Sequence, residues 1–402
     1  MKRQFRDDFP LLKEHSSLAY CDNAATAQKP QYVIDCVDQF CRKENAPVHR
    51  GIYTLAETAT VLYERARENV RAFLNAEDIS EIVFTHGATE SLNTIAAGWA
   101  RYNLKAGDEV VVTEMEHHAN LVPWQRLEKE IGVVLKFIPI TEEGDLDYAA
   151  VDTVITPRTK VVSVTGGSNV IGIDIHLDRI AKRAHEVGAV FIVDAAQSAP
   201  RSRIDVRAIG CDCLVIAPHK LMAPTGVGAF YVNKKLHETF EPLMVGGSMV
   251  LSVDWHDSIW RPVPQRLEAG TPAIAQVVGL GAAIEYINQN VDFDWVAEFE
   301  AELCRRVVDG LLPLNQVRIL GPIEKLRSEG HLVSFSVEGM HSHDVAAFLD
   351  SRGIAVRAGH HCAQPLHNKL GVPNSVRASF YIYNSIEDAE RLVKAMQELL
   401  GV

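Results

Sequence analysis

Residues 211–228 have the sequence Cys211-Asp-Cys-Leu-Val-Ile-Ala-Pro-His219-Lys220-Leu-Met-Ala-Pro-Thr-Gly226-Val-Gly228. The apolar run Leu214 to Ala217 predicts a short buried strand, and the turn after Lys220 leads into a second apolar run, Ala229-Phe-Tyr-Val. Because lysine is among the least buried residue types, Lys220 at the tip of a core strand needs an explanation. Either its ammonium extends into water, or its desolvated amine is a nucleophile that forms a Schiff base. The rest of the chain has to separate these two interpretations.

Strand-like and helical patterns alternate on the N-terminal side of this stretch. Strands are predicted over residues 81–85, 109–113, 133–138, 160–164 and 189–194, and helices over residues 87–102, 121–132 and 177–187. Near-continuous Val and Ile runs joined by helices are typical of a mostly parallel sheet that is covered on both faces. We therefore predict an α/β fold with a large sheet.

A change of pattern after about residue 260 indicates a second domain. Two long helices, two strand-like runs and a final helix follow, and the capping box Ser385-Ile-Glu-Asp388 opens that last helix. This order is typical of a smaller α+β domain. We predict a lead-in over residues 1–20 that packs on the small domain, a large domain over residues 21–265, and a small C-terminal domain over residues 266–402.

Composition and charge narrow the class of protein. The chain has 402 residues and a formal net charge of −12, which argues against a nucleic-acid or anionic-membrane surface. The N-terminal residues lack the apolar core of a signal peptide, and no apolar run is long enough to span a bilayer. Seven cysteines in no regular framework predict mostly reduced thiols, and Cys211-x-Cys213 lacks the second pair that a zinc site needs. We expect a cytoplasmic protein without a bound metal.

Chemically active side chains follow each of the main predicted strands. The first strand leads into Thr85-His-Gly-Ala88-Thr89, a glycine turn whose helix start is suited to a phosphate group. The later strands are followed by His117, by Asn169, by Asp194 and Gln197, and by His219 and Lys220. Because the carboxyl ends of parallel strands meet at one edge of a sheet, where ligands bind, we expect these groups to surround one site.

Pyridoxal phosphate would use each of these groups. Its phosphate would bind at Ala88 and Thr89, and the His117 imidazole would stack on its ring. Asp194 would keep the pyridine nitrogen protonated, which makes the ring an electron sink. Asn169 and Gln197 would bond the phenolate oxygen. Lys220 would then form the Schiff base, which favours the nucleophile interpretation of this lysine.

Two segments near the C-terminus point to a particular family of enzymes. They are Arg357-Ala-Gly-His-His361-Cys362-Ala-Gln-Pro365 and Arg377-Ala-Ser-Phe-Tyr-Ile-Tyr-Asn384. With the strand-end residues, they resemble fold-type I pyridoxal-phosphate enzymes of aminotransferase class V. Within that group the chain resembles the cysteine desulfurases of the Suf/Csd type, which are selenocysteine lyase-like and have a short cysteine loop. The resemblance runs nearly end to end, through Asp22-Asn-Ala-Ala-Thr26, His49-Arg-Gly51 and Ala269-Gly-Thr-Pro272.

The resemblance implies a role for each matching residue. His219 would join Thr89 at the cofactor phosphate, with Thr271 contributed by the neighbouring subunit of a homodimer. His117 would also move protons. The substrate would be bound by Arg377 through its carboxylate, with four further residues nearby: Arg357, His49, Asn169 and Ala24. Cys362 would be the catalytic nucleophile.

The resemblance also implies the reaction. L-cysteine, and also L-selenocysteine, would lose its sulfur or selenium to leave L-alanine, and Cys362 would carry a persulfide. The sulfur would pass to a SufE-, SufU- or CsdE-type acceptor for iron–sulfur cluster assembly or another sulfur-transfer route. Only a thiolate can attack the substrate sulfur, and the imidazoles of His360 and His361 could favour it once protonated or shuttle its proton.

The chain differs from the family at two places, and two alternative functions are retained at this point. Ala217-Pro218 stands where the family usually has a small hydroxyl residue and Gly, and Met222-Ala223 where it has Tyr-Gly. A missing hydroxyl bond to the phosphate suggests weaker cofactor retention. The alternative enzyme is a class V aminotransferase or β-lyase that acts on another amino acid. The alternative from another class is a cofactor-less scaffold for a sulfur-transfer partner.

Overall fold

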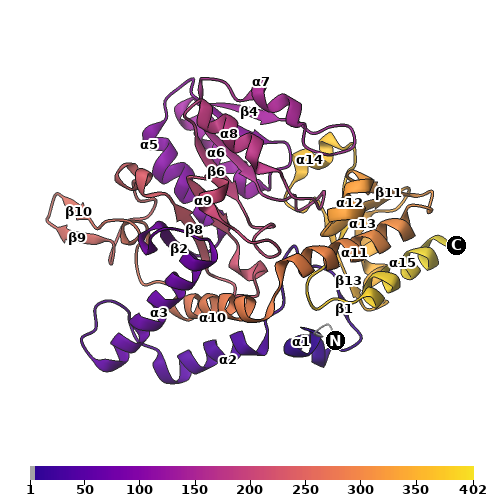
Figure 1. Cartoon of the computed structure of the whole chain (residues 1–402), viewed down its shortest axis with the longest axis horizontal. Helices are drawn as coiled ribbons and strands as arrows, with labels where there is room; N and C mark the ends of the chain where they lie inside the picture. Colours follow the sequence, from indigo (N-terminus) through magenta and orange to yellow (C-terminus); the bar gives the residue numbers. More distant parts are fainter. Residues whose placement is uncertain (1–4) are drawn as a thin grey trace.

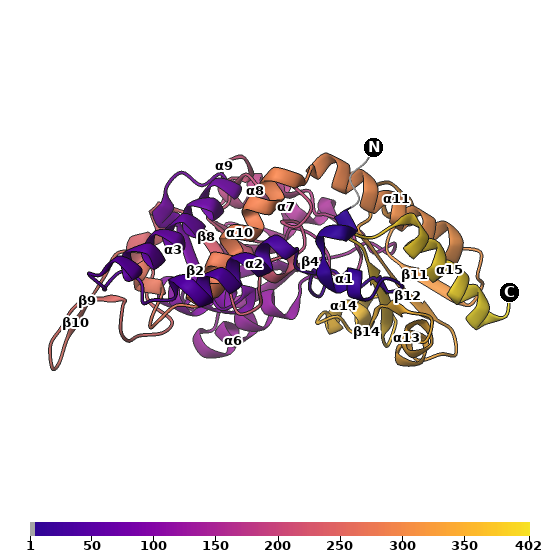
Figure 2. The same cartoon turned by 90° about the horizontal axis from the view of Figure 1, so that it is seen from below.

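The computed structural model describes residues 5–402, and residues 1–4 of the predicted lead-in lie outside this range. Figure 1 shows a large sheet-centred part and a smaller part, at right, that holds the C-terminus. Figure 2 shows the long helices α3 (Thr54–Phe73), α10 (Ile274–Asn290) and α11 (Phe293–Leu311) running along the elongated body. Among the residues described, no helix is both long and apolar enough to cross a membrane.

The large sheet has the strand order β2-β8-β7-β6-β5-β3-β4 within residues 5–402. Its strands are β2 (Ile82–Thr85), β3 (Glu109–Thr113), β4 (Val134–Ile138), β5 (Thr159–Thr165), β6 (Val190–Asp194), β7 (Cys213–Ile216) and β8 (Gly228–Val232). β8 is antiparallel to both neighbours, and the other pairs are parallel. Because the direction reverses twice across β8, β2 runs the same way as β7. Its carboxyl end therefore reaches the same sheet edge as those of the parallel strands.

Helices and buried apolar layers cover both faces of this sheet, as the Val-rich strands predict. The helices of this part are α2 (Gln31–Gln39), α3, α4 (Ala88–Asn93), α5 (Arg101–Asn103), α6 (Val122–Ile131), α7 (Val151–Val154), α8 (Leu177–Glu186), α9 (Val206–Ile209) and α10. The predicted helix over residues 87–102 is present but widens into η4 (Thr94–Ala100) between α4 and α5. There Gly98 lies against the backbone of Glu241, where a Cβ would come within 2.5 Å of the carbonyl oxygen.

The smaller part is built on an antiparallel sheet with the order β11-β12-β15-β14. Its strands are β11 (Val317–Leu320), β12 (Leu332–Val337), β14 (Arg357–Gly359) and β15 (Ser375–Ser379), and its helices are α11, α12 (Ile323–Glu329), α13 (Ser342–Asp350), α14 (Gln364–Lys369) and α15 (Ile386–Leu400). The predicted capping box is confirmed, since the Ser385 and Asp388 side chains each bind the other's backbone N–H.

The N-terminal segment packs on the smaller part. β1 (Ala19–Tyr20) pairs in parallel with β13 (Ile354–Ala355), and the Phe5 ring stacks on Trp295 with centroids 5.4 Å apart. The short helix α1 (Pro10–Glu14) lies between these two contacts in the chain. By its packing, α10 lies with α2 and α3, whereas the predicted boundary at residues 265/266 groups it with the small domain.

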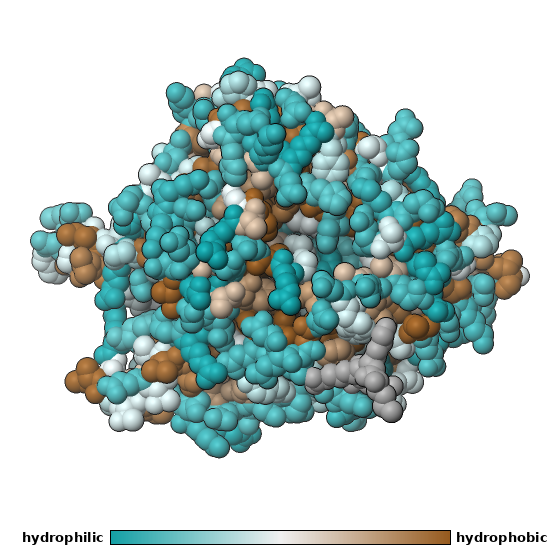
Figure 3. Space-filling model, viewed as in Figure 1, coloured by the Kyte–Doolittle hydropathy of each residue, from teal (hydrophilic) through white to brown (hydrophobic). Residues whose placement is uncertain are grey.

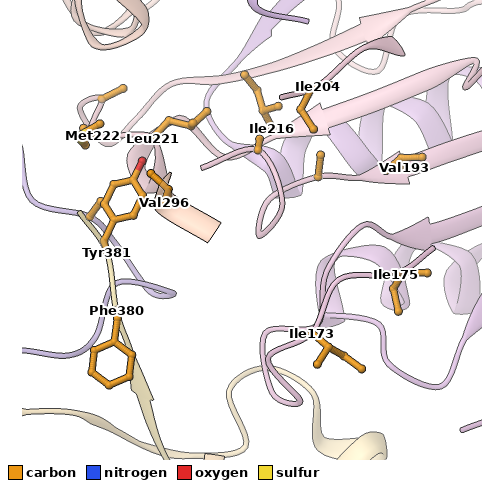
Figure 4. Packing of buried hydrophobic residues seen from close by; sticks show 14 of the residues in the cluster. Ile173, Ile175, Val193, Ile204, Ile216, Leu221, Met222, Val296, Phe380 and Tyr381 are labelled. Carbon is orange, nitrogen blue, oxygen red and sulfur yellow. The ribbon is translucent and has the colours of Figure 1, made fainter. Parts of the chain in front are cut away.

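An apolar contact joins the two parts beside Lys220. Figure 4 shows Leu221 and Met222, which directly follow Lys220, next to Val296 of α11 and next to Tyr381. All four side chains are fully or almost fully buried in one cluster. The turn that carries Lys220 is therefore held between the large sheet and the smaller part.

The hairpin of β9 (Val250–Val253) and β10 (Ser258–Trp260) projects from the body at the left of Figure 1. Figure 3 shows apolar surface at the same place on a face that is otherwise mostly hydrophilic. Its side chains include Trp255, which is 94% exposed, and Leu251, which is 68% exposed. The sequence patterns did not predict this hairpin.

Gly172 lies at the contact between the large part and the smaller part, and a substitution there tests this contact. It has a φ of +80°, its carbonyl accepts the His331 N–H at 3.0 Å, and a Cβ there would lie 2.3 Å from the Leu332 carbonyl oxygen. We predict that Gly172→Ala lowers the free energy of unfolding by about 2 to 4 kcal/mol, from left-handed strain plus overpacking. Chemical denaturation measures this.

The matched control is Gly188→Ala, at a φ of +71° with no atom within 4 Å of the new Cβ. This variant carries only the backbone strain, so its loss should be about 1 to 2 kcal/mol. Equal losses in the two variants would contradict the close contact at the joint.

Candidate active site

A pocket of about 850 Å³ opens at the carboxyl edge of the large sheet. Most of the predicted site residues line it: Ala24, Ala88, Thr89, His117, Asn169, Asp194, Gln197, His219, Lys220, Arg357, Cys362 and Arg377. His49 and Thr271 are exposed and do not line this pocket. His49 instead contacts Glu64 at 2.8 Å. The strand-end groups thus meet at one site, together with the arginines and the cysteine of the smaller part.

Lys220 ends the short helix η7 (Pro218–Lys220), which directly follows β7. Pro218 occupies its first position, where a missing N–H costs no hydrogen bond, and the Lys220 N–H binds the Ala217 carbonyl at 2.9 Å. Burial lowers the pKa of the Lys220 amine to about 8, although the nearby Asp194 carboxylate opposes that shift. The amine is therefore much closer to neutrality than an ordinary lysine.

The backbone just before Lys220 is fixed by residues 26–29. The His219 carbonyl accepts hydrogen bonds from the Ala27 N–H at 3.1 Å, from the Thr26 hydroxyl at 3.2 Å and from the Lys29 ammonium at 3.2 Å. Burial lowers the pKa of Lys29 to about 8. Sequence reasoning missed Lys29, because nothing local in the sequence pairs it with a carbonyl so far downstream.

Asp194 ends β6, the strand beside β7. Its carboxylate is buried and accepts the Ala196 N–H at 3.0 Å, and it forms no salt bridge with any residue in the range 5–402. Burial raises its pKa above the ordinary value, and the Lys220 charge works in the opposite direction. A buried acid without a paired cation fits a ligand that presents an N–H⁺ group.

The start of α4 offers hydrogen-bond donors to the same pocket. Gly87 precedes the helix, and Ala88 and Thr89 form its first turn. β8 runs close against this turn, since a Cβ on Gly228 would lie 2.6 Å from the Gly87 backbone. Together with the Asp194 carboxylate and the Lys220 amine, this arrangement fits pyridoxal phosphate, which combines a phosphate, a pyridinium and an aldehyde.

The two predicted amides also tie the pocket together. Asn169 Nδ2 donates to the His361 carbonyl at 2.6 Å, and Gln197 Nε2 donates to the Ala24 carbonyl at 3.0 Å. Each amide nitrogen carries a second N–H that these bonds do not use. Asn169 therefore links the large sheet to the cysteine loop while it keeps one donor for a ligand.

His117 begins η5 (His118–Asn120), and its Nδ1 accepts the Ala119 N–H at 3.0 Å. Burial, reinforced by the charge of Lys220, lowers its pKa to about 3, so the ring is neutral and carries its proton on Nε2. The loop is anchored by buried Glu116, which binds the Thr113 hydroxyl at 2.7 Å and the Thr165 N–H at 3.0 Å. Burial raises the pKa of Glu116 to about 7. Its anchoring role was not predicted from the sequence.

Two arginines lie side by side because Arg357 of β14 pairs in register with Arg377 of β15. Both contact Asp22, at 3.2 Å and 3.3 Å, and Arg377 Nη1 also donates to the Asn169 carbonyl at 3.0 Å. Arg377 is buried, which lowers its pKa to about 10, and its Nε has no partner within the described residues. Two guanidinium groups that share one carboxylate retain net positive charge for an anionic ligand.

Cys362 lies on the loop between β14 and α14, and it is exposed while it lines the pocket. Its carbonyl accepts the His118 N–H at 2.7 Å, and the Gln364 N–H donates to His118 Nε2 at 3.1 Å. His361 and Cys362 have φ values of +51° and +56°, which are uncommon for residues with a side chain. The loop is therefore held in a strained conformation against the large sheet.

Hydrogen bonds fix the proton positions behind this loop. The Ala363 carbonyl can only accept, so His367 Nδ1 donates to it at 3.0 Å, and His367 Nε2 must accept the Ser375 hydroxyl proton at 2.9 Å. The Ser375 oxygen then accepts from His361 Nε2 at 3.0 Å. Burial lowers the pKa of His361 to about 2. The His361 ring is therefore neutral, which does not support the hypothesis that its protonation favours a thiolate.

His361 Nδ1 is left as a buried acceptor without a partner inside residues 5–402. Across the same range, no group of three or more His, Cys, Asp or Glu side chains is arranged to hold a metal ion. The chemistry of the pocket is thus that of an amine, a thiol, carboxylates, imidazoles and guanidiniums.

Comparison with known proteins identifies the family. The model of the aminotransferase class-V family matches residues 19–392. The chain belongs to the class V aminotransferase family. Among curated relatives of this class V protein, a probable cysteine desulfurase of Halalkalibacterium halodurans is 43% identical over 393 residues, which cover 97% of this chain and 96% of that relative.

Two solved structures resemble this class V enzyme fold closely. The apo structure of a cysteine desulfurase from Thermococcus onnurineus has a TM-score of 0.94 and 39% identity, with complete coverage of both chains. The cysteine desulfurase CsdA of Escherichia coli, in its S-sulfonic acid form, has a TM-score of 0.91 and 37% identity, and the alignment covers 99% of this chain and 98% of that one. The fold-type I architecture expected from the sequence is confirmed.

Ser375 provides a test of the proton arrangement behind Cys362. We predict that Ser375→Ala lowers the free energy of unfolding by about 1 to 3 kcal/mol, because both imidazoles lose a buried partner. Nitrogen-15 NMR should also show that His361 no longer holds its proton on Nε2 alone. The exposed Ser351→Ala change should cost less than about 0.5 kcal/mol and leave the His361 signals unchanged. Unaltered His361 signals in Ser375→Ala would refute the arrangement.

Ala217 provides a test of cofactor retention, because it lines the pocket beside His219 without a hydroxyl. We predict that Ala217→Ser strengthens pyridoxal-phosphate binding by about 1 to 3 kcal/mol through one added hydrogen bond. Equilibrium dialysis with absorbance of the bound cofactor measures this. Ala25→Ser, which adds the same group elsewhere in the pocket lining, should leave the affinity unchanged. Equal affinity of the natural protein and Ala217→Ser would show that the missing hydroxyl group does not weaken cofactor binding.

Proposed function

We propose that this protein is a pyridoxal-phosphate-dependent cysteine desulfurase. It converts L-cysteine and the Cys362 thiol into L-alanine and a persulfide on Cys362. The observation that carries the proposal is that an exposed cysteine thiol opens into the same pocket as the Lys220 amine, the Asp194 carboxylate and the paired arginines. The names of the similar proteins support it.

The cofactor would be held by groups that already surround the pocket. Ala88, Thr89 and His219 would bind its phosphate, and the Asp194 carboxylate would bind its ring nitrogen. Lys220 would be its covalent anchor, which suits an amine whose pKa is lowered to about 8. When bound, pyridoxal phosphate supplies an electron sink that weakens bonds at the α- and β-carbons of an amino acid.

Side chains of the pocket would bind the substrate and transfer its protons. Arg377 and Arg357 would bind the substrate carboxylate, since their shared partner Asp22 leaves them with excess positive charge. The Lys220 amine would accept the α-proton of L-cysteine, which requires a neutral amine at working pH. His117 carries a proton on Nε2 and lines the same pocket, so it would deliver a proton during the reaction.

The sulfur would move to Cys362 in one displacement. The Cys362 thiolate attacks the substrate sulfur, the bond between that sulfur and the β-carbon breaks, and its electron pair remains with the alanine skeleton. The thiol proton is retained in the alanine product, so one L-cysteine and one thiol give one L-alanine and one persulfide. Only the thiolate is a sufficiently strong nucleophile for this step.

We extend the proposal to the partners that the sequence implies. L-selenocysteine would be a second substrate, and a SufE-, SufU- or CsdE-type protein in the cytoplasm would receive the sulfur, for iron–sulfur cluster assembly or another sulfur-transfer route. A homodimer is supported by the exposed apolar hairpin at Trp255 and by exposed Ile52 beside His49. In such a dimer, His49 and Thr271 would be available to the neighbouring subunit's pocket. No nucleic acid or membrane partner is proposed.

Cys362→Ala tests the function. Incubated with L-cysteine, this variant should lose at least about 99% of alanine formation, because no other residue replaces an attacking thiolate. Mass spectrometry should find the natural protein's persulfide on Cys362, and the variant should keep the absorbance of bound cofactor.

The matched control is Cys41→Ala, because Cys41 is also an exposed free thiol but lies outside the pocket lining. This variant should retain full activity. Alanine formation that persists in Cys362→Ala would instead favour a transaminase or β-lyase. Absence of cofactor from the natural protein would favour the scaffold hypothesis.

A further inference from the structure

His118 binds the loop that carries Cys362 at two points. Its backbone N–H donates to the Cys362 carbonyl at 2.7 Å, and its ring Nε2 accepts the Gln364 N–H at 3.1 Å. The loop belongs to the smaller part, whereas His118 lies in η5 between β3 and α6 of the large part. His118 itself does not line the pocket, although its neighbours His117 and Ala119 do. Its contacts are therefore with the cysteine loop and not with a ligand.

The ring of His118 takes the place of a helix cap. Gln364 is the first residue of α14, and Ala363 before it has no side chain that could bind the first N–H groups of the helix. Helices are usually capped at this end by the oxygen of a preceding polar side chain. Here the acceptor is an imidazole that comes from the other part of the molecule. The start of α14 is thus fixed to the large sheet by His118.

The cysteine loop needs contacts of this kind because its backbone is strained. His361 and Cys362 have φ values of +51° and +56°, and left-handed residues with a side chain cost free energy that other contacts must offset. The two bonds from His118 supply part of that compensation, together with the bond from Asn169 Nδ2 to the His361 carbonyl at 2.6 Å. Loss of one of these bonds therefore favours another conformation of the loop.

A second contact between α14 and the large part is weaker. Lys369 Nζ lies 3.0 Å from Glu114 Oε1, and the two side chains are 48% and 23% exposed. Exposed ion pairs contribute little and are screened by salt. The Gln364–His118 bond is consequently the contact that decides whether the start of α14 stays on the large sheet.

This bond exists in only one protonation state of His118. An imidazole nitrogen accepts a hydrogen bond only when it carries no proton, so the ring must be neutral with its proton on Nδ1. A protonated ring would present an N–H group to the Gln364 N–H, and the two donors would repel each other. Burial, reinforced by the charge of His360, lowers the pKa of His118 below its ordinary value. The docked loop thus favours the neutral ring.

Other titratable groups lie around this contact, and His360 is the one whose charge acts on His118. The rings of His117 and His367 have pKa values that burial lowers, so both are neutral. The charges of Glu114 and Lys369 offset each other in their ion pair. The full set comprises Glu114, Glu116 and His117 before His118, His360 and Cys362 on the loop, and His367 and Lys369 on α14.

We propose that His118 is a positioning residue for the sulfur transfer: its neutral ring docks the loop that carries Cys362, and protonation of the ring releases this loop. The inference rests on the proposed function of Cys362. On release, the ring takes one proton from the solvent, the bond to the Gln364 N–H breaks, and no covalent bond changes.

The direction of the pH effect follows from the two states of the ring. The released ring has an ordinary pKa near 6.5, and docking holds the pKa of His118 below that value. Docking is therefore at full strength above about pH 6.5 and weakens as the pH falls below it. Binding of the substrate and the cofactor is unaffected, because His118 does not line the pocket.

Hydrogen exchange at the Gln364 amide tests the docking in the cofactor-loaded natural protein. Its protection, relative to an unstructured peptide at the same pH, should exceed about tenfold at pH 8 and fall at least about threefold by pH 5.5. An unprotected Gln364 amide at pH 8 would overturn the proposal. This measurement needs no substrate and no turnover.

Two substitutions separate the acceptor from its titration. His118→Ala should lose most of the Gln364 protection at pH 8. His118→Gln places an amide oxygen near the position of Nε2, so it should keep the protection at both pH values. The matched control is His15→Gln, at an exposed position, which should behave as the natural protein does. The same fall in protection at pH 5.5 in His118→Gln as in the natural protein would overturn the role of the ring.

Steady-state kinetics at pH 8 test the link to Cys362. For alanine formation from L-cysteine, His118→Ala should lower kcat about tenfold and change KM by less than about twofold, with normal cofactor absorbance. His118→Gln should recover kcat to within about threefold of the natural protein. An unchanged kcat in His118→Ala would overturn the positioning role. A natural protein that forms no alanine would overturn the proposed function instead, and the exchange of the Gln364 amide would still report the docking.

Discussion

The site depends on an amine and a carboxylate that are both withdrawn from water at the ends of two neighbouring strands. β6 delivers Asp194 and β7 delivers Lys220, and their spacing follows from the pairing of the strands. Desolvation alone would push both groups to their neutral forms, whereas their mutual attraction favours the charged forms. The balance leaves a reactive amine and an acid that lacks a cation. Both properties follow from backbone geometry in the sheet.

The half of the site that the large sheet supplies, which includes Asp194 and Lys220, is encoded mostly by local sequence. For this reason the sequence predicts it. A polar residue directly after a buried Val- or Ile-rich run lies at a known edge of a parallel sheet, and that rule located Asp194, Asn169 and Lys220 without any long-range information. The rule also held for Thr89, which follows β2, although β2 reaches the edge only because β8 reverses direction. The reversal itself was not predicted, since a short apolar strand shows no preference for either orientation.

The other half of the site is set by contacts between distant residues. Arg357 and Arg377 meet through strand register, and the cysteine loop docks on His118 from more than 200 residues away in the chain. Sequence patterns give no register for such pairs, so these residues were identified only by resemblance to a family.

The backbone of the cysteine loop limits how far Cys362 can travel. Two consecutive left-handed residues turn the chain sharply, and the Cys362 carbonyl is bound to the His118 N–H while its thiol stays exposed. A sulfur atom on this thiol cannot swing outward on a flexible arm without breaking that bond and Asn169's bond to His361. In the proposed reaction, a recipient of this sulfur would consequently have to bring its own acceptor atom to the mouth of the pocket. Transfer of the sulfur would then depend on how far the recipient reaches into the pocket, since Cys362 would stay in place.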